Sequence, residues 1–351
     1  AILDGGVHNG IYEENGIARA TANSHGKDTS LNCTLYFQMV ENLVIENITI
    51  KNQRYWGIAL YTTTYSRVSN IHFESESNVP CQDGVDLLKG CHDCIVENIT
   101  GCVGDNAVAI LAADSVYNQV VQTVREGDIY NITVRNVMVY GVAGCALIRI
   151  LNHDGYKIYN IFIDNLMETS PWSKDDASTA PNADLNIVSD AEGNVYAKKH
   201  LVPGEKGYRC EAAIIIGESY WYEKEKAAHG DTYGIHVSNV MTHARYAVFL
   251  NNTLLDSSFD RIRMFGNGFV AAYFGAGQYE NVRFDHVYYD RDARPLAEDE
   301  HIYIDWNQTK SDGFSCVYFN GANVKNISVQ DVCCAEGMDS VFGGHGCGNV
   351  L

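Results

Sequence analysis

The chain consists of short hydrophobic runs of about four or five residues, separated by Gly, Asn and Asp. Val, Ile and aromatic residues dominate these runs, and such side chains are typical of β-strands that end in turns. No segment shows a sustained helical period with capping residues, and Gly is frequent at 31 residues while Pro is scarce at 5. The pattern therefore predicts an all-β protein.

Two kinds of strand alternate along the chain. The first kind carries Asn before hydrophobic residues, at 46–50, 69–73, 97–100, 135–139, 164–167, 238–241 and, more loosely, 330–333. The second kind is more uniformly apolar, at 57–61, 84–87, 107–110, 145–148, 212–216, 246–250, 270–274 and 316–319. A repeat of two to three dozen residues with one such pair predicts a parallel β-helix, in which each coil covers the next. Residues one coil apart then lie about 4.8 Å from each other.

The length and composition fit one domain over residues 1–351. The chain is 46% hydrophobic, and a solenoid of this length does not need to split into separate cores. A non-repeat insertion at about 168–208 is expected to leave from a turn, either as the wall of a binding cleft or oligomer contact or as a disordered surface loop. The chain opens on a strand-like segment, so we expect that a leader or N-terminal cap has been removed or that the chain is a fragment. The residues leave the oligomeric state open.

The net charge limits the partners. A charge of −19 with no basic stripe excludes nucleic acid as a partner, and no apolar run is long enough to span a bilayer, so no membrane partner is predicted. The same charge works against a long polyanionic substrate unless a local basic patch offsets it. Candidates for such a patch are Lys89, Arg149, Lys157 and Arg209.

The 11 Cys residues do not predict a disulfide framework, because many occupy small apolar positions inside strand runs and are expected to be reduced. Cys91 and Cys94 have the local spacing of zinc ligands, but no second pair follows at the usual distance, so we predict no metal and no cofactor. Reduced cysteines favour a cytoplasmic location, with a trimmed secreted chain as the alternative. Several sequons for N-glycosylation coincide with the strand pattern and say little about location; they begin at Asn32, Asn47, Asn98, Asn131, Asn251, Asn307 and Asn326.

Two acidic motifs stand one repeat apart: Gln82-Asp83-Gly84-Val85-Asp86-Leu87 and Gly104-Asp105-Asn106. An offset of 23 residues places Gln82 and Asp105 side by side if each coil has about that length. Glycoside hydrolysis needs one protonated carboxyl to supply the leaving oxygen with a proton and one carboxylate to activate water or attack carbon. Crowded acids suit this chemistry, because like charges keep one carboxyl protonated. The alternative is that Asp83 and Asp105 are ordinary turn-formers beside Gly.

The segment from Arg54 to Leu111 resembles the pectin-lyase-like right-handed parallel β-helices, in particular the family 28 glycoside hydrolases of the polygalacturonase and rhamnogalacturonase type and their uncharacterised relatives. Members of that family carry Asn-Thr-Asp-Gly-Ile-Asp, then Gly-Asp-Asp, then Gly-His-Gly and Arg-Ile-Lys elements. The two acidic motifs resemble the first pair, with Gln82 at the Thr position and Asn106 at the second Asp position. No Gly-His-Gly follows on the next coil, where Gly141-Val142-Ala143-Gly144 stands, and Arg149-Ile150-Leu151 lacks the Lys.

The resemblance implies a single-stranded right-handed parallel β-helix and a division of roles among the acids. By the family's roles, Asp105 is the general acid, Asp83 is the base that activates water, and Asp86 supports it. The family inverts configuration, which requires about 6.5–9.5 Å between acid and base. At position 106 an amide replaces a carboxylate, and an amide orients water without taking its proton. Either Asp83 acts alone, Asp86 takes over, or the chemistry differs.

Other residues are candidates for substrate binding. Aromatic side chains stack on sugar rings, which favours Trp56, Tyr220 and Trp221, although the last two fit a surface loop equally well. Polar candidates around the acids are Gln82, Asn106, Lys89 and Arg149. His153 completes the site in place of the missing Gly-His-Gly, or lies in a solvated turn.

These residues lead to three hypotheses. The first is a glycoside hydrolase that cleaves a plant-type, expected pectic, polysaccharide or oligosaccharide with inversion. The second is a polysaccharide lyase on the same scaffold, with Arg149 or Lys89 as base and calcium held by acids. The third is a non-catalytic, glycan-binding or spike-like β-helix, which the Asn at position 106 and the missing histidine element favour.

Overall fold

The computed structural model describes residues 1–5, 11–14, 17–20, 33–53, 55–75, 82–113, 127–140, 146–169, 187–189, 195–197, 210, 212–217, 226–266, 268, 270–291, 302–303, 310–311, 315–334 and 340–345. Most of the insertion predicted at 168–208 therefore lies outside the described residues, as do Tyr220 and Trp221.

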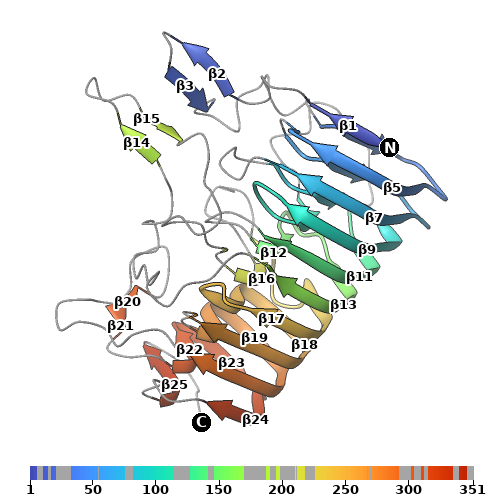
Figure 1. The fold of residues 1–351 in the computed structure, drawn as a ribbon. Helices are drawn as coiled ribbons and strands as arrows, with labels where there is room; N and C mark the ends of the chain where they lie inside the picture. Colours follow the sequence, from blue (N-terminus) through green and yellow to red (C-terminus); the bar gives the residue numbers. More distant parts are fainter. Residues whose placement is uncertain are drawn as a thin grey trace.

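The described residues form a single-stranded right-handed parallel β-helix whose coils follow one another in sequence order (Figure 1). Each coil contributes a front strand and a back strand, and each pairs in parallel with its counterpart one coil away. The front strands are β4 (Leu35–Gln38), β6 (Ile58–Tyr61), β8 (Val85–Leu88), β10 (Val108–Ala112), β12 (Ala146–Asn152), β16 (Ala212–Gly217), β22 (Ser315–Asn320) and β25 (Ser340–His345). The back strands are β1 (Ile2–Asp4), β5 (Val44–Lys51), β7 (Arg67–Glu74), β9 (His92–Cys102), β11 (Ile129–Tyr140), β13 (Ile158–Glu168), β17 (Thr232–Thr242), β23 (Ala322–Lys325) and β24 (Ser328–Cys334).

Two long strands, β18 (Tyr246–Gly266) and β19 (Val270–Arg291), run through both the front and the back of their coils. Three short antiparallel pairs complete the described elements: β2 (Ile11–Glu14) with β3 (Ile17–Ala20), β14 (Ile187–Ser189) with β15 (Val195–Ala197), and β20 (Ile302–Tyr303) with β21 (Lys310–Ser311). The β14–β15 pair lies within the predicted insertion. In the described part of the chain, no helix has the length and apolar character that crossing a bilayer requires.

The core runs along the inside of the coils. In β8 and β10, Val85 and Leu87 pair with Val108 and Ile110, and all four side chains are fully buried in one hydrophobic cluster. Side chains alternate across a strand, so the residue between Val85 and Leu87 points to the opposite, outer face. That residue is Asp86.

Five asparagines on the back strands form a ladder of side-chain hydrogen bonds from coil to coil. Asn47, Asn70, Asn98, Asn136 and Asn165 all adopt the left-handed conformation, with φ between 56° and 59°. Asn tolerates this conformation better than other residues that carry a Cβ. Each side-chain Nδ2 donates to the Oδ1 of the preceding Asn at 2.8–3.1 Å, so the ladder ties five coils together.

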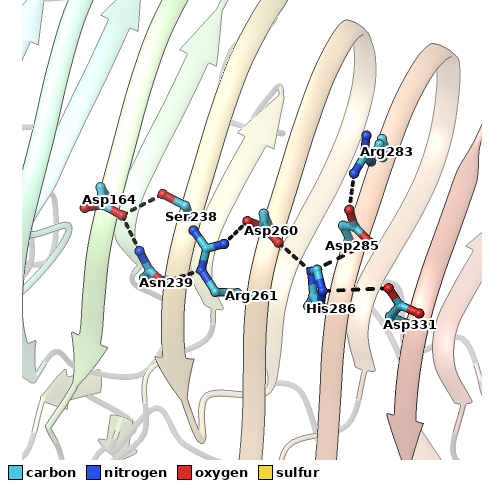
Figure 2. Close-up of polar contacts among 9 residues, drawn as sticks. All are labelled: Asp164, Ser238, Asn239, Asp260, Arg261, Arg283, Asp285, His286 and Asp331. Atoms are coloured by element: carbon cyan, nitrogen blue, oxygen red, sulfur yellow. Dashed lines mark hydrogen bonds and ion pairs between the residues drawn. The ribbon is translucent and has the colours of Figure 1, made fainter.

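Towards the C-terminal end, charged residues take the place of the asparagines (Figure 2). Asn239 donates to Asp164 at 2.6 Å and accepts from Arg261 Nε at 2.7 Å. On the next coil His286 Nδ1 lies 3.0 Å from Asp260, and His286 Nε2 lies 3.7 Å from Asp331. The remaining contacts in the strip are Ser238 with Asp164, Arg261 with Asp260, Arg283 with Asp285 and His286 with Asp285. Ionisable side chains thus take over the contacts between coils along this strip.

Candidate active site

The register of the front strands brings the two acidic motifs together. Because Val85 pairs with Val108, Asp83 lies opposite Asn106 and Gln82 lies opposite Asp105. The backbone nitrogen of Gly104 donates to the carbonyl of Gln82 at 3.0 Å. The side-by-side placement predicted from the 23-residue offset is therefore observed.

Small residues let the coils approach closely beside Asp83. A Cβ added at Gly84 would collide with the carbonyl oxygen of Ala107 on the next coil and would press on the ring of Phe73. The preceding turn is fixed by buried amides: Gln53 Nε2 donates to the carbonyl of Asp83 at 3.3 Å, and Gln82 Nε2 donates to the carbonyl of Gln53. Gln82 is fully buried, so its amide holds the backbone under the acids.

Asn106 links the acids of the two motifs. Its Nδ2 donates to Asp83 Oδ1 at 3.0 Å and to Asp105 Oδ1 at 2.8 Å, and its Oδ1 accepts from the backbone nitrogen of Ala146 at 3.3 Å. A side-chain amide has two N–H donors, and both are used here. Asn106 therefore holds Asp83 and Asp105 in a fixed relation.

The three acids differ in exposure. Asp83 is 4% exposed and Asp86 is 1% exposed, whereas Asp105 is only partly buried. Among the described residues, no hydrogen-bond donor reaches either carboxyl oxygen of Asp86. Asp105 is thus the member of the cluster with access to solvent, and Asp86 is the member without a partner.

Burial raises the pKa of the Asp83 carboxyl well above its usual range, and the charge of Asp105 adds to this, while the hydrogen bond from Asn106 opposes it. Burial also raises the pKa of Asp86, with further increases from the charges of Asp83 and then Asp105. Two like charges about 5 Å apart repel by roughly 3 kcal/mol at an effective dielectric constant of about 20. A hydrogen bond to a charged group returns about 1.5–3 kcal/mol. One amide donor therefore offsets one like-charged neighbour at Asp83, and nothing offsets it at Asp86.

Residues from the preceding coils form the N-terminal side of the site. Trp56 lies opposite Asp83 in register, and Cys33 lies opposite Trp56. Tyr36 and Ala59 continue the row of Asp86. Trp56 packs with Tyr55, Ala59, Tyr61 and Leu88 in a small cluster that Cys33 also contacts.

Cys33 and Tyr36 were not candidates from the sequence. Burial, followed by the charges of Asp86 and Asp83, raises the pKa of Cys33 to about 12. Burial, followed by Tyr61 and Cys33, raises the pKa of Tyr36 to about 12. The run Leu35-Tyr36-Phe37-Gln38 is the second kind of strand one coil earlier, and its resemblance to Ile58–Tyr61 is the signal that identifies it.

Arg149 shares the outer front face with Asp86. It pairs with Ala109, which pairs with Asp86, so one coil lies between Arg149 and Asp86. Partly buried and bordered by the small Ala109, Arg149 is a cation on the C-terminal side of the acids.

Lys89 and His153 lie at the turns where their front strands end. Lys89 Nζ donates to the hydroxyl of Tyr156 and lies 4.4 Å from the centre of its ring. His153 is completely buried, and its backbone nitrogen donates to the carbonyl of Ala112 at 2.8 Å. The carboxyls of Asp83 and Asp86 thus have Trp56 and Arg149 on their face, whereas Lys89 and His153 belong to the turn.

This arrangement is suited to proton transfer at a solvent-facing carboxyl supported by buried ones. It is not arranged as a metal centre, because the described residues bring three ligand atoms within 4.8 Å of one another only at Asp260, Asp285 and His286. There the carboxylates already pair with Arg261 and Arg283. The thiols of Cys91 and Cys94 donate to the carbonyls of Leu60 and Thr63 at 3.2 and 3.3 Å.

No family model and no curated protein matches the chain. Among solved structures, the Agl-KA catalytic domain is similar with 14% identity and a TM-score of 0.46, over 90% of this chain and 54% of that one. The family 28 exopolygalacturonase of Yersinia enterocolitica has 8% identity and a TM-score of 0.40, over 87% and 46%. The exopolygalacturonase of Thermotoga maritima has 12% identity and a TM-score of 0.34, over 88% and 55%. The chain thus spans about half the length of these proteins, and similarities of this size identify no substrate.

Proposed function

We propose that this protein is a glycoside hydrolase that cleaves a plant-type polysaccharide or oligosaccharide by acid/base catalysis. The observation that carries the proposal is the junction of two coils at Asn106, whose side-chain nitrogen donates to both Asp83 and Asp105. Inversion, expected from the resemblance, needs a wider gap between acid and base than two carboxyls that share one nitrogen provide. The two acidic motifs that resemble family 28 glycoside hydrolases are the motifs that meet there. Their resemblance and their contact support the same chemistry.

Exposure supports the assignment of roles. Asp105 is the partly exposed carboxyl, so it is the one placed to give a proton to the leaving glycosidic oxygen. Asn106 Nδ2 donates to Asp105 Oδ1 at 2.8 Å and so fixes the orientation of this carboxyl. Asp83 is the buried carboxylate that takes the proton of water, and its bond from Asn106 stabilises its ionised form.

The surroundings support a substrate of pectic type. Tyr36, which is exposed on the N-terminal side, offers aromatic surface for a sugar ring, while Trp56 is buried at 7% exposure, and Arg149 on the C-terminal side offers a cation for a uronate carboxylate. The net charge of −19 repels a long polyuronate, which favours short oligosaccharides.

The test is incubation with pectic and neutral oligosaccharides, with new reducing ends and unsaturated products measured together. We expect saturated products from the native chain and a loss of about 10²–10⁴-fold in rate for Asp105→Ala, the range associated with a general acid. Glu46→Gln is the matched control, because Glu46 is an exposed acid on the back strand β5.

Each other outcome contradicts the proposal in its own way. Unsaturated products identify a lyase. Sugar binding without turnover, unchanged by Asp105→Ala, identifies a glycan-binding protein. A proton NMR spectrum of the first product measures whether its configuration is inverted or retained.

A further inference from the structure

Asp86 is a buried acid for which the proposed reaction assigns no proton transfer. Its side chain is on the outer front face of β8, three residues after Asp83, and it is 1% exposed. Both carboxyl oxygens are inaccessible to solvent, and neither has a hydrogen-bond partner among the described residues. A buried carboxylate without any donor is far costlier than a buried neutral acid. Burial and hydrogen bonding therefore favour the neutral form.

The charged groups around Asp86 do not reverse this preference. Asp83 lies just before β8, and the turn before β10 carries Asp105, so both neighbouring charges are negative. On the N-terminal side, β6 contributes Ala59 and Tyr61, and β4 with the residues before it contributes Tyr36 and Cys33, which are neutral near pH 7. On the C-terminal side, β10 contributes Ala109, and the nearest cation in this row is Arg149 on the coil beyond.

The described residues gather no set of metal ligands around Asp86. The three acids of the site are not among the described groups in which three ligand atoms converge within 4.8 Å of one another. A proton needs only one carboxyl. It is the smallest positive charge that satisfies a buried acid flanked by anions.

We propose that Asp86 keeps its proton at neutral pH and is a positioning residue, whose neutral carboxyl allows Asp83 beside it to ionise. The part that concerns catalysis rests on the hydrolase function proposed above. The three acids then carry distinct states: Asp83 is ionised through its bond from Asn106, Asp105 exchanges its proton with substrate, and Asp86 stays neutral throughout. A charged Asp86 would hold a proton on Asp83 and so remove the base.

The first experiment detects the proton without any substrate. Because the proposed general acid Asp105 also carries a proton, the infrared spectra are taken at pH 7 on the Asp105→Asn chain, with aspartate labelled by ¹³C at the side-chain carboxyl, and on the same chain with Asp86→Asn or Asp83→Asn added. We expect a carboxylic-acid carbonyl band in Asp105→Asn that persists when Asp83→Asn is added and disappears when Asp86→Asn is added. Absence of the band from Asp105→Asn, or its persistence after Asp86→Asn is added, overturns the proposal. A loss of the band on addition of Ca²⁺ overturns it as well, because an ion would then have displaced the proton.

The second experiment measures the pH dependence of kcat/KM. If Asp86 is already neutral, Asp86→Asn moves the acid limb of the profile by less than about half a pH unit. We expect Asp86→Ala to lower kcat/KM because it removes the side chain that positions Asp83, and Asp86→Asn to retain most of the native value. If Asp86 is ionised in the native chain, its removal shifts the acid limb down by about one unit or more, because Asp83 loses a negative neighbour. That shift overturns the proposal.

The two experiments separate this proposal from the function. If no glycan is cleaved, the infrared band still decides whether Asp86 holds a proton. If glycans are cleaved and the band belongs to Asp83, the hydrolase stands and the role of Asp86 is wrong. Circular dichroism of each variant checks that the β-helix is intact.

Discussion

Glu97 on the back of the β-helix and Asp86 on the front are both buried carboxyls with opposite surroundings. Glu97 is 3% exposed and accepts from Arg67 Nε at 2.7 Å and from Arg135 Nε at 2.6 Å. Burial alone would raise the pKa of Glu97, but the two arginines outweigh it and lower this pKa below its ordinary value. Asp86 is equally buried, but no described residue donates a hydrogen bond to its carboxyl oxygens. The carboxylate of Glu97 on the back therefore has charged hydrogen-bond donors, whereas the carboxyl of Asp86 on the front has none among the described residues.

The difference separates two uses of a buried acid. A carboxylate paired on both sides stabilises a fold above its own pKa, whereas an unpaired one lowers stability at neutral pH. Natural sequences retain such unfavourable groups where function needs a shifted pKa. The four substitutions below, from the largest expected effect to the smallest, test this contrast.

Asn106→Asp is expected to have the largest effect, because it replaces the donor of two hydrogen bonds by a fourth carboxyl. We expect a loss of about 3 kcal/mol or more in the free energy of unfolding at pH 7. The loss should shrink towards pH 4, where carboxyls become protonated. Urea unfolding at both pH values measures it. The matched control is Asn131→Asp, which removes one exposed bond to Asp93; equal losses in the two variants would contradict the argument.

Asp86→Asn is expected to raise the free energy of unfolding at pH 7 by about 2 kcal/mol. The folded-state pKa of Asp86 lies above its unfolded value of about 3.9, so the native chain loses stability as pH rises from that value towards the folded pKa. The variant lacks this slope, and the two chains should be equally stable below about pH 4. Thermal unfolding across pH measures the difference. A variant less stable than the native chain at pH 7 would show that Asp86 is a satisfied ion.

Glu97→Gln is expected to lower the free energy of unfolding by about 1–2 kcal/mol at pH 7. The loss is modest because the side chains of Arg67 and Arg135 are each 51% exposed and water screens the pair. The sign with pH is opposite to that of Asp86: the folded pKa is lowered, so this stabilisation is complete above about pH 4.3 and disappears as pH falls through the folded pKa. Urea unfolding between pH 3 and 7 follows it, and a pH-independent loss would rule out the ion pair as its cause.

Asn98→Ala is expected to cost about 1–2 kcal/mol, because Asn98 donates to Asn70, accepts from Asn136 and adopts φ of 56°. Asn98→Gly should cost less, since Gly loses the hydrogen bonds without strain in the left-handed region. The melting temperatures of the two variants check the order. Equal melting temperatures would assign the whole effect to the lost bonds.

The sequence predicts the coil because the Asn ladder and the buried strands leave a periodic signature. It predicts the contact of the acidic motifs because one short coil separates them, so the offset fixes the register. The prediction missed the first-kind segments in β18 and β19, where Arg261 and His286 occupy the left-handed position instead of Asn. Charge pairing across coils replaces the amide ladder there, and a search for Asn does not find it.

Contacts between residues on coils of irregular length could not be predicted from the sequence. Lys89 meets Tyr156 because both lie at the turn edge, and no periodic pattern connects residues 67 positions apart. The burial of His153, and the burial of the Asp86 carboxyl oxygens without hydrogen-bond donors among the described residues, depend on which side chains of neighbouring coils cover them. The roles predicted for Tyr220 and Trp221, which lie outside the described residues, remain predictions.

Asparagine contacts between coils also bear on how this chain behaves in a host that attaches sugars to proteins. Asn98 in the ladder, and Asn131 and Asn326 outside it, each begin a glycosylation sequon, and each donates its Nδ2 to the coil before it. An N-linked glycan forms its bond through that same nitrogen, so modification and the contact between coils compete for one atom. A glycan found at any of these positions would therefore mark a molecule that was modified before its coils formed. The fraction of molecules that carry the glycan would then report how slowly the coils form relative to glycosylation.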